Sequence, residues 1–506
     1  MRKAASLLGR FCRQFKGSLN RNFLVEKNEI SLTLVPATIQ THGNHSQRRM
    51  STKAKLADRL KGTEKNIWVD FGKLAVENKA LNLGQGFPDY PPPQHVVDEL
   101  VKAITGNNSL IHQYTRSYGN PHLVNTLAKL YCPFLGGQVD PMNEITISVG
   151  AYGVLFCAVQ GLINPGDEVI IIEPFFDCYE PMVMVAGGKP VFVPLRPAEK
   201  GGVLSSADWK LDPEELSSKF SSRTKAIIVN NPNNPLGKVF NRDELEMIAG
   251  LCKKHDVICI SDEVYEWMVY DGNKHIKIAT LPDMWERTIT VGSAGKAFSV
   301  TGWKLGWGIG PPHLIKCLQV LHQNCIYTCP TPIQEAVASG LDYEITQLNH
   351  PEKCYLYTLA KELLPKRDFL AKTLSDFGMI PTIPEGGYFM MADISKLNLQ
   401  IPEDGTDDPY DFKFVRWMTK EKKFTAIPTS AFYSKNHKSL GEKFVRFCFI
   451  KQNSIVDSCS INAEVLSTEF LIEHILPLAV DEMTKPYKRL ENCSKIGKLH
   501  LLDIYD

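Results

Sequence analysis

Five short apolar runs limit most strongly the folds that this 506-residue chain can adopt. They lie at residues 145–147, 168–172, 226–229, 257–260 and 288–291. Apolar residues largely follow one another within the runs, as in strands that are buried on both faces of a parallel sheet. Helical patterns such as residues 243–255 separate them. The chain is therefore predicted to be an α/β protein with helices on both faces of a mostly parallel sheet.

The pattern changes near residue 351. A long helix is predicted at residues 354–377, and the apolar segments that follow, at 386–392 and 444–449, lie farther apart. We interpret this part as a smaller α+β domain. Before the large sheet, residues 68–81 are predicted to form an amphipathic helix, and residues 82–89 a Gly/Pro loop.

These patterns divide the chain into five parts. They are a leader at residues 1–56, an N-terminal segment at 57–91 that is expected to pack on the small domain, a large domain at 92–345, a small domain at 346–455 and a divergent tail at 456–506. A stripe of apolar residues at 461–476 predicts one helix in the tail; the alternative is an unrelated extension.

The composition argues against several classes of partner. A net charge of +1 gives no electrostatic basis for binding nucleic acid, and no apolar run is long enough to span a bilayer. The 13 cysteines are scattered, without a CxxC pair or a Cys/His cluster of zinc spacing. They are expected to be buried free thiols in a reducing compartment, and no metal site is predicted.

The leader is rich in lysine and arginine, and only Glu26 and Glu29 oppose this charge. Apolar residues between Leu7 and Phe15 fall at helical spacing, with arginines on the other side. This pattern resembles a mitochondrial transit peptide. A mitochondrial location is expected; the alternative is a disordered basic tail on a cytoplasmic protein.

In open α/β sheets, ligands bind beyond the carboxyl ends of the strands, so the residues after each run are candidates for a site. Gly150, Ala151, Tyr152 and Gly153 follow the first run and precede a helical pattern at residues 154–162. The backbone N–H groups at the positive end of such a helix suit a phosphate. An ordinary strand-to-helix turn is the alternative.

Aromatic and amide side chains follow the next two runs. Phe175 and Phe176 follow the second, where an aromatic ring could stack on a planar ligand or pack in the core. Asn230 and Asn234 follow the third, in a loop that two prolines confine. Their amides could act as fixed donors and acceptors, although turns rich in Asn and Pro are common.

A carboxylate follows the fourth run: Asp262, with Tyr265 three residues later. A carboxylate is costly to bury unless it is paired. A protonated pyridine nitrogen is a suitable partner, because this pairing makes a pyridine cofactor an electron sink. The alternative is a salt-bridged aspartate at a helix N-terminus.

Lys296 follows the fifth run, with Ser293 three residues before it and Lys304 eight residues after it. A partly desolvated lysine can form a Schiff base with an aldehyde cofactor. A phosphate-binding P-loop is excluded, since that motif needs Gly at Thr290 and Ser or Thr at Ala297. A surface lysine is the alternative for this residue alone. Pyridoxal 5′-phosphate (PLP) would use all of these groups together.

Four motifs, in this order, resemble the fold type I aminotransferases. They are LGQGFPD at residues 83–89, EPFFDCYEP at 173–181, NNPLGK at 233–238 and SAGK at 293–296. Within that family they resemble the kynurenine aminotransferase and cysteine-S-conjugate β-lyase group, over about residues 68–451. The resemblance implies a large domain with a mostly parallel seven-stranded sheet flanked by helices, and a smaller α+β domain.

The resemblance also implies two sets of site residues. Those implied to hold PLP are Gly150, Ala151, Tyr152, Phe176, Asn234, Asp262, Tyr265, Ser293, Lys296, Lys304 and Tyr114. Those implied to bind the substrate are Gly86, Asn230, Asn234, Arg446, Trp68 and Tyr327.

Catalytic roles are implied for Lys296, Asp262 and Tyr265. Lys296 would form the Schiff base and transfer the proton, Asp262 would pair with the pyridine nitrogen, and Tyr265 would bond the phenolic oxygen with the help of Asn234. Arg446 would hold the substrate α-carboxylate in a two-pronged contact.

A homodimer is implied, because the family pattern places Tyr114 and Tyr327 at the site of the second subunit. The implied activity is a ping-pong transfer of the amino group of kynurenine, glutamine, methionine or an aromatic amino acid to a 2-oxo acid. The alternatives are cysteine-S-conjugate β-elimination as the main role and a glutamine/phenylpyruvate-type transaminase. A PLP-sensing regulator would need a DNA-binding domain, and neither terminus has a helix-turn-helix pattern.

Two positions depart from the family pattern. Ala297 stands where a threonine commonly follows the lysine, and the family's closing helix is not recognisable beyond Gln452.

Overall fold

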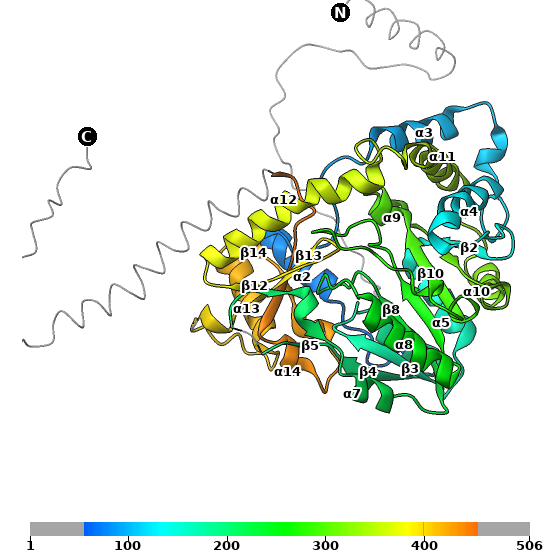
Figure 1. The fold of residues 1–506 in the computed structure, drawn as a ribbon. Helices are drawn as coiled ribbons and strands as arrows, with labels where there is room; N and C mark the ends of the chain where they lie inside the picture. Colours follow the sequence, from blue (N-terminus) through cyan, green and yellow to red (C-terminus); the bar gives the residue numbers. More distant parts are fainter. Residues whose placement is uncertain (1–54, 200, 398, 454–506) are drawn as a thin grey trace, which may run out of the picture. The chain divides into compact units, whose positions relative to one another are not determined.

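A seven-stranded sheet forms the centre of the part of the chain that is predicted to be the large domain (Figure 1). The computed structural model describes residues 55–199, 201–397 and 399–453. The rest of the predicted leader, and the tail with its expected helix at residues 461–476, lie outside these residues.

The strand order in this sheet is β2-β11-β10-β9-β8-β3-β4, and every strand except β11 runs in the same direction. The strands are β2 (Ile145–Val149), β3 (Glu168–Glu173), β4 (Lys189–Pro194), β8 (Thr224–Asn230), β9 (Ile258–Asp262), β10 (Thr288–Ser293) and β11 (Leu305–Ile309). The five apolar runs of the sequence are all strands of this one sheet, which confirms the predicted mostly parallel α/β fold.

Helices cover both faces of the sheet. They are α3 (Gln94–Thr105), α4 (Pro121–Leu135), α5 (Gly150–Leu162), α6 (Tyr179–Val185), α7 (Pro213–Ser218), α8 (Arg242–His255), α9 (Ala294–Ala297), α10 (Pro312–Cys325) and α11 (Thr331–Gln347). Neighbouring residues of β3 enter different cores: Ile170 packs with Ile248 of α8, and Ile171 packs with Val154 of α5. Burial on both faces explains why the strand sequences are continuously apolar.

A second sheet, with the order β15-β16-β13-β12-β6, forms the other layer that lines the site. Its strands are β6 (Leu204–Ser205), β12 (Ile380–Ile383), β13 (Phe389–Asp393), β15 (Ile427–Pro428) and β16 (Phe444–Cys448). The helices α12 (Tyr355–Asp376), α13 (Tyr410–Glu421) and α14 (Lys438–Gly441) belong to the same region. Two short strand pairs complete the described chain: β1 (Leu81–Asn82) with β14 (Phe424–Thr425), and β5 (Arg196–Pro197) with β7 (Trp209–Lys210).

The expected α+β character of the C-terminal part is therefore present. The predicted domain boundaries stay a prediction. β6 lies inside the predicted large domain in the sequence, but it pairs with β12 of the second sheet.

The helix expected at residues 68–81 is shorter in the structure: α2 spans Ile67–Glu77. Lys79 has a left-handed backbone with φ of 51°, and the N–H of Leu81 donates to the carbonyl of Lys423 at 2.8 Å. Pairing of β1 with β14 therefore replaces the last helical turn, a contact that the local sequence pattern does not contain.

β4 and β11 were not identified from their own sequences. In β11, Gly306 interrupts the apolar pattern for a packing reason: a Cβ atom there would lie 2.3 Å from the backbone nitrogen of Ala151. The start of α5 thus lies so close to β11 that only glycine, which has no side chain, fits at position 306.

Two further sequence expectations concern the membrane and the cysteines. Among the described residues, none of the helices combines the length and the apolarity that crossing a membrane requires. The cysteines in this part of the chain are free thiols, and most of them are buried.

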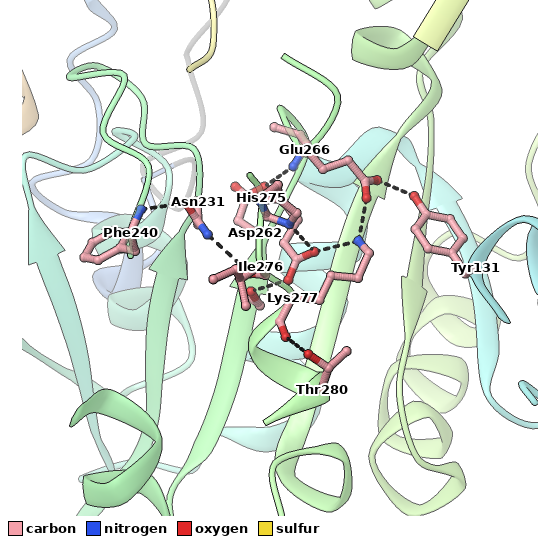
Figure 2. Close-up of polar contacts among 12 residues, drawn as sticks. Tyr131, Asn231, Phe240, Asp262, Glu266, His275, Ile276, Lys277 and Thr280 are labelled. Atoms are coloured by element: carbon pink, nitrogen blue, oxygen red, sulfur yellow. Dashed lines mark hydrogen bonds and ion pairs between the residues drawn. The ribbon is translucent and has the colours of Figure 1, made fainter. Parts of the chain in front are cut away.

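A buried ionic cluster stabilises the segment that follows β9 (Figure 2). The Lys277 ammonium donates to Glu263 Oε2 at 2.8 Å and also to Glu266. His275 Nε2 lies 2.9 Å from the same Glu263 oxygen, and the Tyr131 hydroxyl donates to Glu266. Glu263 directly follows Asp262, so this cluster holds the end of β9 in place.

Glu263, Glu266 and His275 present ligand atoms that could hold a metal ion. The ammonium of Lys277 already contacts both carboxylates. Its positive charge therefore neutralises them in place of a metal cation. Although burial opposes ionisation, the charges of Lys277 and His275 lower the pKa of Glu263 to about 2. The cluster is therefore a charged structural element.

Replacing Lys277 with methionine should destabilise the fold, because two buried carboxylates would lose their cation. Breaking a buried ion pair on one side costs about 3–5 kcal/mol. Thermal unfolding should show a large fall in Tm for Lys277→Met, whereas Lys274→Met, at a nearby exposed lysine, serves as the control. Equal Tm values for the two variants would contradict this role.

Candidate active site

A cavity of about 770 Å³ lies at the carboxyl ends of the parallel strands. The predicted site residues that line it are Trp68, Gly86, Gly150, Ala151, Tyr152, Phe176, Asn230, Asn234, Asp262, Tyr265, Ser293, Lys296, Lys304 and Arg446. They converge because parallel strands end at one edge of a sheet: Asn230 ends β8, Asp262 ends β9 and Ser293 ends β10.

Lys296 lies on the short helix α9, which follows β10 directly. Its amine donates a hydrogen bond to the Tyr388 hydroxyl, and it lies 5.4 Å from the centre of the Tyr265 ring. Burial lowers the pKa of Lys296 to about 8, and the cations Arg446 and Lys304 act in the same direction. A larger share of this amine is therefore neutral near pH 7 than for an exposed lysine, as a Schiff-base lysine requires.

Asp262 is buried and points into the cavity without a cationic partner. Its carboxylate accepts hydrogen bonds from the Tyr179 hydroxyl at 2.6 Å and from the backbone N–H of Val264 at 3.4 Å. In the described part of the chain, no Lys, Arg or His forms an ion pair with it. Burial raises the pKa of Asp262 to about 6, so the group is costly here unless a ligand N–H pairs with it.

The first turn of α5 is shaped to hold an anion. Gly150 has φ of 72°, and a Cβ atom added there would lie 3.5 Å from the Lys304 ammonium. Lys304 and Ser293 line the same end of the cavity, and the helix of which Gly150 is the first residue supplies its positive N-terminus. Among the described residues, Lys304 forms no ion pair with a carboxylate.

Arg446, on β16, is completely buried. One of its terminal nitrogens donates to the Asn234 side-chain oxygen at 2.9 Å and the other donates to the carbonyl of Gly84 at 2.7 Å. Its Nε has no hydrogen-bond partner, and its guanidinium lies 3.9 Å from the centre of the Phe389 ring. Burial lowers the pKa of Arg446 to about 10, so it is still cationic at neutral pH and can receive a carboxylate.

A chain of amides connects Arg446 to the end of β9. The Asn234 backbone N–H donates to the Asn230 side-chain oxygen at 2.7 Å, and the Asn230 amide donates to the carbonyl of Asp262 at 3.0 Å. The Asn234 oxygen is bound to Arg446, so its amide nitrogen is the atom that can face a cofactor oxygen. The loop between β8 and α8 therefore sets the distance between the two charged groups.

Aromatic rings form one wall of the cavity. The centre of the Phe176 ring lies 6.3 Å from that of Trp68 and 6.4 Å from that of Tyr152. The Trp68 indole donates to Asp177 at 2.7 Å, and this bond holds the indole beside Arg446.

Tyr114 and Tyr327 do not line the cavity of this chain. Their side chains are 79% and 54% exposed, and their ring centres are 5.3 Å apart in a T-shaped contact. An exposed aromatic pair suits the expectation that these residues serve the site of a second subunit.

Four contacting residues were not proposed from the sequence. Tyr179 binds Asp262, Asp177 binds Trp68, Tyr388 binds Lys296 and Phe389 stacks on Arg446. Tyr179 and Asp177 lie in the EPFFDCYEP motif, so this motif could have identified them as site residues from the sequence. The other two lie at the start of β13 (Phe389) and just before it (Tyr388), and they reach the site only because the two sheets pack together.

The donor set fits PLP on three independent observations. Asp262 is a buried carboxylate without a cation, the Gly150 turn and Lys304 form a cradle for an anion, and Lys296 is a buried amine between them. PLP carries an N–H group, a phosphate and an aldehyde that match these three in chemistry.

Comparison with known proteins identifies the family of this chain. The model of the family "Aminotransferase class I and II" matches residues 78–457. Kynurenine–oxoglutarate transaminase 3 of Homo sapiens is 56% identical over 417 residues, which is 82% of this chain and 91% of that protein. Kynurenine–oxoglutarate transaminase 1 of Homo sapiens is 50% identical over 406 residues, 79% of this chain and 96% of that protein.

Among solved structures, the N-succinyldiaminopimelate aminotransferase of Mycobacterium tuberculosis superposes with a TM-score of 0.73 at 34% identity. The match covers 81% of this chain and 100% of that one. This chain therefore belongs to the class I and II aminotransferase family.

Proposed function

We propose that this protein uses PLP to transfer the amino group of kynurenine, and of glutamine, methionine or aromatic amino acids, to a 2-oxo acid. The observation that carries the proposal is the convergence of Lys296, Asp262 and Arg446 in one cavity. The names of the two human relatives, both kynurenine–oxoglutarate transaminases, support the choice of substrate.

PLP, when bound, withdraws electrons from the substrate Cα and so makes the loss of its proton possible. Asp262 would hold the ring N–H, and Gly150, Ser293 and Lys304 would hold the phosphate. Lys296 Nζ, with its lowered pKa, would take the proton from the Cα of the amino donor as a general base and, in the second half of the cycle, would deliver a proton to the Cα of the new amino acid as a general acid.

Arg446 supplies a fixed position for the substrate. Every amino acid carries an α-carboxylate, so a buried guanidinium with a free Nε binds all of them in the same orientation. Trp68, which lies beside Arg446, would then border the substrate side chain, where flat aromatic groups can stack, while Phe176 would stack on the cofactor ring.

We further propose a homodimer in the mitochondrion. The exposed pair of Tyr114 and Tyr327 supports the dimer, and the basic, amphipathic sequence of residues 1–56 supports the location. Fusion of residues 1–56 to a reporter protein tests the location, because a cytoplasmic reporter would contradict it.

A product assay tests the activity. Incubation with kynurenine and a 2-oxo acid should yield a new amino acid and kynurenic acid, the ring-closed product. With a cysteine conjugate, release of ammonia and pyruvate would instead identify β-elimination, which no contact in the described site specifically favours.

Replacing Lys296 with alanine should abolish turnover while leaving the fold intact. Loss of general acid–base catalysis alone costs about 10²–10⁴-fold in rate, and loss of the Schiff-base amine adds to this. Steady-state kinetics and the cofactor absorbance of the purified variant measure the effect, with Lys274→Ala as the control. Turnover like that of the wild type would disprove the role of Lys296.

Replacing Arg446 with alanine should raise KM for every amino acid by a similar factor, since all share the α-carboxylate. A charge-assisted hydrogen bond contributes about 1.5–3 kcal/mol, roughly 10- to 150-fold in affinity. Arg446→Lys keeps the charge but loses the planar fork, and it should recover only part of the loss. An effect confined to kynurenine would place Arg446 at the side-chain end of the site.

Mixing two inactive variants should restore activity if Tyr114 serves the partner's site. One chain carries Lys296→Ala and the other carries Tyr114→Ala. In a two-fold dimer, each mixed dimer has one site with both residues intact, so random mixing should restore about a quarter of the wild-type activity. No restoration after demonstrated subunit exchange, or full activity of a monomer, would contradict the shared site.

A further inference from the structure

The hydroxyl of Tyr388 makes the closest polar contact of the Lys296 amine. Tyr388 lies just before β13 and is buried, with 1% of its surface exposed. Its hydroxyl donates to the carbonyl of Gly86 at 2.9 Å and also contacts Lys296 Nζ. A hydroxyl has one hydrogen and two lone pairs, so Tyr388 donates to Gly86 and accepts from Lys296.

Packing holds the Tyr388 ring in this position. The ring centre of Tyr388 lies 5.1 Å from that of Tyr265, at an interplanar angle of 85°. A Cβ atom on Gly86 would come within 3.3 Å of the Tyr388 ring and 2.4 Å of the Phe389 ring. The loop that carries Gly86 therefore packs directly on the two aromatic residues, and the hydroxyl cannot turn away from Lys296 without moving this loop.

We propose that Tyr388 is a catalytic residue of this site, whose hydroxyl holds the free Lys296 amine while that amine takes the Cα proton of the amino donor and later delivers a proton to the Cα of the new amino acid. The inference rests on the proposed function, since it needs Lys296 as the base. In the step, Nζ gains one proton and then releases it, and Tyr388 is neutral throughout. Burial, together with the neighbouring Tyr265 hydroxyl, raises the pKa of Tyr388 well above its usual value, so this hydroxyl keeps its hydrogen.

The groups that set the charge state of Lys296 come from several elements. They are the carboxylate of Asp262, the cations Arg446 and Lys304, the thiol of Cys448 and the hydroxyl of Tyr388, with the Tyr265 ring 5.4 Å away. Among the polar groups, only the Tyr388 hydroxyl can be removed without changing a charge or a thiol. An accepting oxygen stabilises the ammonium more than the neutral amine, so removing it should lower the Lys296 pKa further.

The test compares Tyr388→Phe with Tyr270→Phe. Tyr270 is also buried, and its hydroxyl donates to the carbonyl of Gly387, but it does not contact Lys296. For Tyr388→Phe, kcat should fall by about ten- to a hundredfold with little change in KM, which corresponds to the loss of one hydrogen bond to a charged group. Tyr270→Phe should retain the wild-type kcat.

A second measurement does not depend on turnover. The full-length chain, freed of cofactor, is labelled with an amine-acylating reagent over a range of pH, and mass spectrometry follows the modification of Lys296. Tyr388→Phe should shift the labelling midpoint of Lys296 to lower pH, whereas Tyr270→Phe should leave it unchanged. If the midpoint and kcat of Tyr388→Phe both match those of the wild type, the proposal is wrong.

Two further variants distinguish a folding defect from the loss of the hydrogen bond between Tyr388 and Lys296. If Tyr388→Phe does not fold, Tyr388→Gln, whose amide oxygen can still accept from Lys296, should label at a midpoint near that of the wild type, whereas Tyr388→Leu, which has no acceptor, should label at lower pH. Equal midpoints for these two variants would overturn the proposal. Because labelling needs no turnover, this result is independent of whether kynurenine is the substrate.

Discussion

The register between the parallel strands β8, β9 and β10 is the constraint on which the site depends. Asn230 stands beside Asp262 in the β8–β9 pair, and Asp262 stands beside Val291 in the β9–β10 pair. Polar side chains that follow three separate apolar runs are thereby placed at one edge of the sheet. A shift of one residue in any pair would turn a site residue toward the opposite face.

Charge at this edge is balanced in two different ways. Glu263 turns away from the cavity into the cluster with Lys277, where every charge has a partner inside the protein. Asp262, the residue before it, points into the cavity, where its partners are neutral donors only. Strand alternation separates a structural carboxylate from one that is available to a ligand, although the two are adjacent in the sequence.

The second sheet completes the site from the opposite side. β16 supplies Arg446, and the residue just before β13 is Tyr388, while the loop with Gly84 and Gly86 accepts hydrogen bonds from both residues. Arg446 and the Tyr388 hydroxyl that contacts Lys296 are thus connected through one short loop. Movement of this loop would alter both groups together.

The sequence by itself determined the class of the fold, the strands that carry the site and most of the residues that line its cavity. This was possible because buried strands have a local signature and their ends must meet at one edge. Only the tertiary structure decided the contacts of Tyr388, Phe389 and Tyr179, and the pairing of β1 that ends α2 at Glu77. These contacts join residues that are distant in sequence, so no local spacing or periodicity encodes them.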